Sequence, residues 1–344
     1  MSNDLSYGNY TDEYPNYTFD YSDDACNDTE VRRFESVVTP IFFTIVIILS
    51  CVGNVLVLWI LNRYENLSSL TNAFLVNVAI SDLLFTAGLP FWASYHVWGW
   101  TFGNIGCKLV SFVFYLGYYS SLIFLTVMTV HRYMAVMYPL SVALNKKPDY
   151  CIVMSVVIWF FSICAATPNF IFKKLVFSSD NEAFCDYQGE NHFWKLFGIF
   201  QQNIFFLVAF ITIAFCYTCI LGRLLRPMSH TRPKTVKLIL CIVIVFFIGW
   251  MPYNVTIFLD SLITWQVSPF NICEVSKTVG YIHNISRLIA FSHCCLNPVF
   301  YVFVGIKFRS HLKKMLKNLC GHEEQSQHRH SRFIYSNGEE ISMY

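Results

Sequence analysis

The sequence predicts an all-α membrane protein, a seven-transmembrane helix bundle with a short cytosolic amphipathic eighth helix. Of 344 residues, 55% are hydrophobic and 13% are charged, whereas about a quarter of the residues in a soluble domain are charged. The apolar runs also reach the roughly 20 residues that an α-helix needs to cross a bilayer. We expect the bundle to occupy residues 37–304, with spans at 37–61, 70–98, 109–130, 151–172, 196–221, 238–259 and 278–304.

The apolar runs are nearly free of charge. Five of them contain no Asp, Glu, Lys or Arg, and the other two contain only Asp82 and Arg287. Because backbone groups cannot bond to water in lipid, a span must be a helix or part of a closed barrel, and uninterrupted apolar runs favour helices. A seven-helix transporter is the structural alternative, but the sequence has no visible inverted repeat.

The basic residues predict the orientation. With the N-terminus outside, 16 of the 24 Lys and Arg residues fall in segments on the cytosolic side, as the positive-inside rule requires. Residues 1–30 lack the basic and apolar parts of a cleavable signal peptide, so the first span is expected to target and anchor the chain. We therefore expect a multi-pass protein of the plasma membrane with a cytosolic C-terminus.

The segment 1–36 is expected to be an extracellular, acidic and glycosylated N-terminal tail, called the acidic leader below. It contains sequons at Asn9, Asn16 and Asn27. Residues 1–31 carry eight acidic side chains and no basic one, a charge that attracts a basic partner. The alternative is a solvated tail that only keeps this end soluble. The side chains expected to contact a basic ligand are Tyr14, Asp20, Tyr21, Asp23 and Asp24.

The cysteines on the outer side suggest disulfides. Four of the 13 cysteines fall outside or at the outer surface, in an oxidising compartment. Four cysteines allow three connectivities, of which we favour Cys107–Cys185 with Cys26–Cys273. Two other groups look metal-like, a CxxC motif at residues 216–219 and the His-Cys-Cys sequence at 293–295, but both lie inside spans, where packing is the better interpretation.

Polar side chains inside the spans indicate a functional core. Ionisable residues are costly in lipid and usually face the bundle interior. Asp82, Asn54, Ser121 and Asn297 offer oxygen ligands that suit an allosteric sodium ion; a structural water network is the alternative. No other cofactor is expected. Prolines are expected to kink five spans, among them those containing Pro252 and Pro298. The sequence shows no nucleophile paired with a base and no phosphate loop, so neither an enzyme nor a nucleic-acid partner is expected.

The segment that follows the last span has features of a membrane-surface helix. Residues 305–320 place apolar side chains at helical spacing among several lysines, a pattern that suits the anionic inner leaflet of the lipid bilayer. Cys320, the last residue of this segment, is expected to be a palmitoylation site. Residues 321–344 are predicted to be disordered.

Several short motifs resemble those of rhodopsin-like (class A) G-protein-coupled receptors, in the same order and in the same spans. They are GN at 53–54, SDLLF at 81–85, HRY at 131–133, Trp159, WMPYN at 250–254 and NPVFY at 297–301. Within that class, LPFWA at 89–93 and the run 291–309 resemble chemokine receptors, most of all the XC-type (lymphotactin) receptors. Amine receptors and opsins do not fit, because the positions of their Asp and Lys are occupied by Phe114 and Phe291.

The resemblance implies a basic chemokine as ligand, a heterotrimeric G protein of the inhibitory type and arrestin as cytosolic partners, and sulfation of the leader's tyrosines. It also implies a pocket lined by Trp92, Tyr115, Trp250, Tyr253 and Arg287. Many chemokine receptors have Glu where this chain has Arg287. We therefore predict that Arg287 captures a carboxylate of the ligand. Snorkelling, or pairing with Asp260, is the alternative.

The cytosolic mouth of the third span also departs from the family pattern. His131 replaces the Asp that, in related receptors, precedes Arg132 and restrains it in the resting state. A mostly neutral imidazole does not replace that carboxylate, so the restraint is weaker or comes from elsewhere in the bundle. Signalling is favoured, with a non-signalling chemokine scavenger and another peptide-binding class A receptor as alternatives. The residues assigned to coupling are His131, Arg132, Tyr133, Tyr217, Trp250, Pro252, Asn297, Pro298 and Tyr301.

Overall fold

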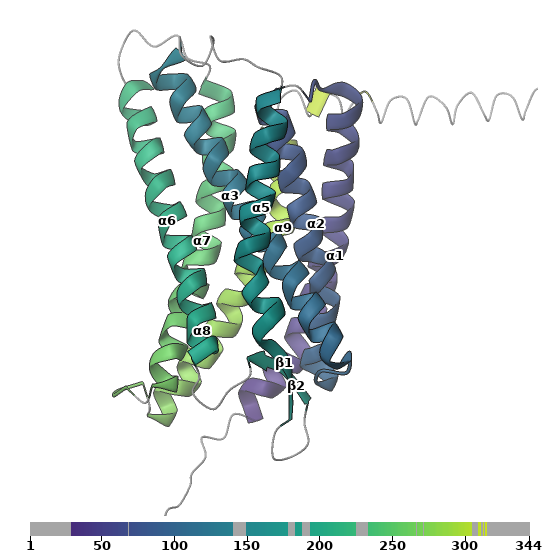
Figure 1. Cartoon of the computed structure of the whole chain (residues 1–344), viewed down its shortest axis with the longest axis vertical. Coiled ribbons are helices and arrows are strands. Elements are labelled where there is room, and N and C mark those ends of the chain that lie inside the picture. Colours follow the sequence, from purple (N-terminus) through teal and green to yellow (C-terminus); the bar gives the residue numbers. More distant parts are fainter. Residues whose placement is uncertain are drawn as a thin grey trace, which may run out of the picture.

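A computed structural model describes residues 29–67, 69–139, 149–177, 183–187, 193–224, 233–265, 267–270, 272–304, 309, 310, 312 and 314. For residues 29, 149, 224, 233–243, 245 and 300–304 it describes the backbone only. The helices of this part are α1 (Thr29–Tyr64), α2 (Leu70–Trp98), α3 (Gly103–Met137), α5 (Asp149–Phe172), α6 (Phe193–Leu224), α7 (Pro233–Thr264), α8 (Cys273–Phe291) and α9 (His293–Val304). A hairpin of β1 (Lys173–Phe177) and β2 (Ala183–Tyr187) lies at one end of the bundle (Figure 1), called the hairpin end below.

The seven predicted spans are confirmed. Six helices of the described part, α1, α2, α3, α5, α6 and α7, are long and apolar enough to cross a membrane. The seventh span is divided at Ser292 into α8 and α9. Most helices run past the apolar stretches that predicted them, and α1 begins at Thr29, inside the segment expected to be the acidic leader.

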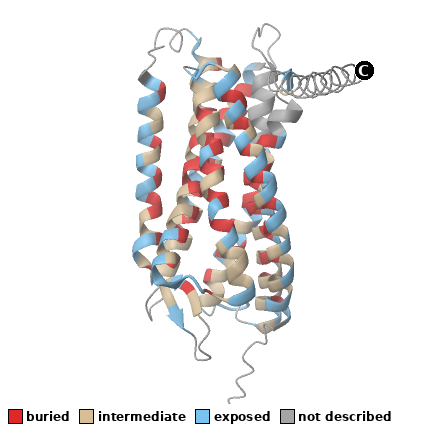
Figure 2. Ribbon diagram, turned by 90° about the vertical axis from the view of Figure 1, so that its right-hand side faces the viewer, coloured by how far each residue is buried: buried red, intermediate tan, exposed pale blue. Residues whose placement is uncertain are grey.

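Burial follows the bundle geometry. Figure 2 shows buried residues gathered toward the interior and exposed residues on the outward faces. Many outward side chains are large and apolar, for example Ile41, Ile152 and Val208, as expected for helices that face lipid. At the closest approach of α2 to α3, a Cβ on Gly117 would lie 2.7 Å from Ser81 O and 2.8 Å from Phe85 Cα, so only glycine fits there.

Pro298 sets the contact between α9 and α1. Proline lacks the N–H that would bond to the carbonyl four residues earlier, which here belongs to Cys294. That carbonyl accepts a hydrogen bond from Asn54 Nδ2 at 2.8 Å. A Cβ on Gly53 would lie 2.8 Å from Pro298 Cβ, so the GN motif of α1 both makes room for the proline and satisfies the carbonyl that it frees.

The hairpin is fixed to α3. Its antiparallel strands pair Lys173 with Tyr187 and Leu175 with Cys185. Cys185 forms the predicted disulfide with Cys107 near the start of α3. Cys273 is also disulfide-bonded; its expected partner Cys26 lies outside the described residues, so that pairing stays a prediction.

Several predictions fall mostly outside the described residues. They include the leader side chains from Asn9 to Asn27, the tail 321–344 and Cys320. Of the predicted surface helix 305–320, positions 309, 310, 312 and 314 are helical, and Leu312 packs against the core of the bundle.

Candidate functional site

A cavity of about 340 Å³ lies among the helices at the hairpin end. Its wall is formed by α1, α2, α3, α7, α8 and both strands of the hairpin. This volume lies within the range of ligand pockets, which are mostly apolar with a few placed polar groups. Four residues of the expected ligand-binding set line it: Trp92, Tyr115, Tyr253 and Arg287.

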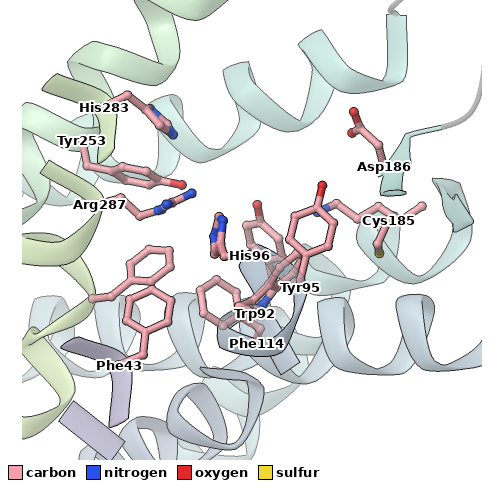
Figure 3. A pocket seen from close by; sticks show the side chains of 13 residues that line it. Phe43, Trp92, Tyr95, His96, Phe114, Cys185, Asp186, Tyr253, His283 and Arg287 are labelled. Atoms are coloured by element: carbon pink, nitrogen blue, oxygen red, sulfur yellow. The ribbon is translucent and has the colours of Figure 1, made fainter. Parts of the chain in front are cut away.

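Arg287 is paired inside the bundle. Its Nη2 lies 3.5 Å from Glu35 Oε1 on α1 and donates to Thr39 Oγ1 at 3.5 Å. The other Glu35 oxygen lies 3.7 Å from Nδ1 of His96, and Figure 3 shows Arg287 and His96 pointing toward one another in the pocket. The expected alternative partner, Asp260, instead lies 3.5 Å from Lys195, so that alternative is wrong.

A second cation, Lys173, enters the pocket from the start of β1. It is 7% exposed, and its Nζ lies over the rings of Trp92 at 5.4 Å, Tyr115 at 5.2 Å and Tyr187 at 5.2 Å, within the range of cation–π attraction. Burial lowers the pKa of Lys173 to about 8, although Asp186 opposes the shift. The ammonium is therefore charged at neutral pH but costly to keep charged.

Trp250 lies deeper than the sequence predicted. It is 1% exposed and does not line the large cavity; it lines a neighbouring one of about 10 Å³. Its ring centroid lies 4.4 Å from that of Tyr118 and 5.9 Å from that of Phe291. Phe291 also lines the large cavity, so a ligand there reaches Trp250 through one layer of aromatic side chains.

The polar core places three of the four expected sodium ligands together. Asp82 is fully buried, and it accepts hydrogen bonds from Ser121 Oγ at 3.3 Å and Asn297 Nδ2 at 2.7 Å. His293 Nε2, dismissed from the sequence as packing, lies 3.7 Å from the same carboxylate. Asn54 instead bonds to the Cys294 carbonyl. A sodium ion here would find protein oxygens on Asp82 and Ser121, while Asn297 presents its N–H group.

Comparison with known proteins identifies the family. The sequence profile of the 7 transmembrane receptor (rhodopsin family) matches residues 53–301. Chemokine XC receptor 1 of Homo sapiens is 42% identical over 88% of this chain and 87% of that receptor, and its Mus musculus counterpart is 40% identical over 88% and 90%. C-C chemokine receptor type 1 of Homo sapiens is 35% identical over 89% and 88%.

The chain is a chemokine receptor of the rhodopsin family. It is therefore a multi-pass membrane receptor of the G-protein-coupled class, not an enzyme. Of the signature motifs, Asn54, Asp82 and Asn297 are buried in the polar core, and Trp250 lies beneath the pocket and not in its wall.

At the end of the receptor opposite the hairpin, Arg132 is restrained from α2. Its Nη2 donates to Thr71 Oγ1 at 2.6 Å, and its Nε has no acceptor among the described residues. The ring of Tyr133 lies 5.9 Å from that of Phe215, and Tyr217 is buried nearby on α6. The restraint on Arg132, expected to be weaker or to come from elsewhere in the bundle, therefore includes the Thr71 hydroxyl. A hydroxyl accepts a weaker hydrogen bond from a guanidinium than a carboxylate does.

Sequence reasoning missed Glu35, Lys173, His96 and Thr71. Glu35 was assigned to the leader, and Lys173 was counted only as one of the basic residues on the outer side. Their roles depend on contacts between distant segments, which no local pattern reports. One sequence feature bears on Glu35. Acidic side chains are favoured in the first turn of a helix, and Glu30 lies in the first turn of α1, so an earlier helix start could have been expected.

Proposed function

We propose that the receptor binds a basic chemokine of the XC type at the hairpin end, outside the cell, and activates an inhibitory heterotrimeric G protein at the other end. The observation that carries the proposal is the large cavity at the hairpin end, the end of the bundle at which α1 begins. The similarity to the two XC receptors supports the ligand class.

The ligand contacts the receptor in two regions, the acidic leader and the cavity. The acidic leader attracts the folded, basic body of the chemokine by long-range electrostatics, and sulfation of Tyr14 and Tyr21 would strengthen that field. The ligand's flexible end then enters the cavity. A carboxylate of that end competes with Glu35 for Arg287, because the pair at 3.5 Å already satisfies the guanidinium in part. Arg287 thus favours ligands that bring an acidic group.

Activation follows from the layer beneath the pocket. A ligand that displaces Phe291 shifts its neighbour Trp250, two residues before Pro252 on α7. We expect α7 to swing outward about this proline, where the helix lacks a backbone hydrogen bond. Arg132 then leaves Thr71 and, with Tyr217, receives a helix of the G protein. Arrestin is expected to bind the same end after phosphorylation of the tail.

A non-signalling scavenger is the second candidate, because His131 stands where the family usually has Asp. A panel of purified chemokines on cells that express the chain separates the candidates. Binding of an XC-type chemokine with loss of cyclic AMP supports the proposal. Binding with internalisation but no cyclic AMP or calcium response identifies a scavenger. Binding of a peptide but of no chemokine contradicts the proposed ligand.

The proposed orientation has its own test. Glycosidase treatment of intact cells should lower the apparent mass of the receptor through Asn9, Asn16 and Asn27, and an antibody to the C-terminal tail should bind only after permeabilisation. Labelling of the tail on intact cells would contradict the proposal. Palmitate incorporation that is lost in Cys320→Ser would support the lipid anchor after residues 305–320.

A further inference from the structure

Lys173 has no carboxylate within ion-pair distance among the described residues, although its side chain is buried. The three rings around it come from α2, α3 and β2, and the Cys107–Cys185 disulfide ties the strand next to it to α3. The lysine is thus held in one place by a rigid frame. Three ring faces give attraction of about 0.5–2 kcal/mol each, less than a buried ammonium loses in leaving water.

The same wall of the pocket has a second donor without an acceptor. Trp92 Nε1 is buried and has no hydrogen-bond partner in the described part of the chain. Its indole is one of the rings beneath the Lys173 ammonium, at 5.4 Å, and both residues line the large cavity. A buried donor that stays unpaired costs free energy, so this wall favours a ligand with a strong acceptor.

Arg287 and Lys173 differ in what an anion must displace. Arg287 already has Glu35 at 3.5 Å and Thr39 at 3.5 Å. At Lys173 an anion displaces no carboxylate at ion-pair distance. The ion pair that it forms adds to the cation–π contacts of the lysine. The cation of the pocket without a carboxylate at ion-pair distance among the described residues is therefore Lys173 on the hairpin wall, where Asp186 also lines the cavity and favours the charged lysine from further away.

We propose that the pocket binds small organic anions, a carboxylate on an aromatic scaffold, with Lys173 and the indole N–H of Trp92 as the anion-binding groups. The aromatic lining of the cavity, including Tyr115 and Phe114, receives the scaffold by ring contact. The cavity of about 340 Å³ is large enough for a fused two-ring compound. The proposal concerns small molecules, and it holds whether or not a chemokine is the protein ligand.

The test uses the full-length receptor in lipid nanodiscs and a matched pair of probes, 6-fluoro-2-naphthoate and its neutral amide, 6-fluoro-2-naphthamide. Fluorine NMR line broadening measures the dissociation constant of each. We expect the carboxylate to bind at least tenfold more tightly than the amide, since a hydrogen bond between charged groups is stronger than one between neutral groups. Equal affinity of the two probes, or no binding of either at millimolar concentration, would overturn the proposal.

Variants locate the anion. Lys173→Met keeps the hydrocarbon stem and removes the charge, and it is expected to abolish the preference for the carboxylate. Lys173→Arg keeps the charge and should retain the preference, as should Lys195→Gln, since Lys195 pairs with Asp260 and does not line the cavity. Loss of the preference in Arg287→Gln with retention in Lys173→Met would overturn the assignment to Lys173.

A pH titration needs no variant. The Lys173 ammonium, with its pKa at about 8, is charged below that pH, and a bound anion raises the value further. The carboxylate preference should therefore be full at pH 7 and lost by pH 10; an unchanged preference at pH 10 overturns the proposal. Among the other facing groups, burial raises the pKa of Tyr187, which keeps it protonated. The remaining titratable groups of the wall are Tyr95, His96, Tyr115, Asp186, Tyr253, His283 and Arg287.

Discussion

Glu35 Oε1 on α1 lies 3.5 Å from Arg287 Nη2 on α8, so the first turns of α1 are tied to a residue of the cavity wall. With 23% and 14% of their side chains exposed, the two groups lie between water and the bundle interior, where an ion pair is stronger than at the surface. The pair holds the first helix to the last span, and a ligand that takes Arg287 releases it.

Reversal of the charge at Arg287 should abolish activation. In Arg287→Glu two carboxylates face one another, and no cation remains on this wall for an acidic ligand group. We expect at least a hundredfold loss of chemokine potency in a cyclic AMP assay, while binding that depends on the acidic leader persists in a flow-cytometry measurement. Normal activation of the Arg287→Glu variant would contradict the proposed role of Arg287 in the pocket.

The matched control exchanges the two charges. The double variant Glu35→Arg with Arg287→Glu restores an ion pair between α1 and α8, so surface expression and thermal stability should recover. Activation should stay lost, because the cation has moved to a different helix. Recovery of activation in the double variant would show that the pair serves only to hold the helices together.

Loss of the Thr71 hydroxyl should raise basal signalling. The bond from Arg132 at 2.6 Å restrains a charged donor, and such bonds contribute about 1.5–3 kcal/mol. We expect Thr71→Val to raise ligand-independent inhibition of cyclic AMP about tenfold, which corresponds to about 1.4 kcal/mol. The control is Thr212→Val, which removes an exposed hydroxyl bonded within α6; equal basal activity in both variants contradicts the prediction.

The contact between α2 and α3 should not tolerate a methyl group. In Gly117→Ala the new Cβ meets backbone atoms of Ser81 and Phe85, and overpacking of this kind costs about 1–3 kcal/mol. We expect a melting temperature several degrees lower in detergent. Gly222→Ala on α6, where nothing lies within 4 Å of the added carbon, should leave it unchanged or raise it. Equal melting temperatures of the two variants would contradict the prediction.

Removal of the hairpin disulfide should lower the stability of the receptor more than removal of a free thiol does. Cys107 and Cys185 are separated by 78 residues, and a cross-link over such a loop stabilises by about 4–5 kcal/mol in the chain-entropy treatment. Cys185→Ser should therefore reduce surface expression and chemokine binding severely. Cys164→Ser, at a free and exposed cysteine, is the control and should behave as the unaltered receptor.

Sodium should oppose agonist binding through Asp82. An ion held by Asp82 and Ser121 in the resting arrangement stabilises that arrangement by mass action. We expect agonist affinity to fall when sodium replaces N-methylglucamine at constant ionic strength, and Asp82→Asn to remove the effect. The same sodium dependence in both forms would argue for a water network without an ion.

The sequence was sufficient for the spans because the bilayer dictates their length and apolar character. It was less informative at the helix ends, where α1 and α3 continue beyond the predicted apolar spans in sequences of mixed polarity. The hairpin was not predicted, since strands of five residues leave little pattern. The division of the last span at Ser292 was equally hidden.

The site was predicted in part, because the bilayer also restricts which residues occur within the spans. Arg287 was recognised because a charged group is rare at membrane depth, and the aromatic residues of the pocket were given by the family resemblance. The partner of that arginine was not, because Asp260 and Glu35 are both acidic residues near the outer surface and only the packing of α1 against α8 decides between them. Lys173 follows a span directly, and nothing in its local sequence indicates that its side chain turns inward.

The division at Ser292 has a mechanical meaning. A straight rod would carry a push on Arg287 along its axis to Asn297. Because the helix is interrupted between them, we expect such a push to emerge as sideways pressure of Phe291, whose ring lies 5.1 Å from Phe114 and 5.9 Å from Trp250. This crowded layer of rings would make the receptor sensitive to the shape of what enters its cavity, and ligands of equal charge but unequal bulk should differ in efficacy more than in affinity.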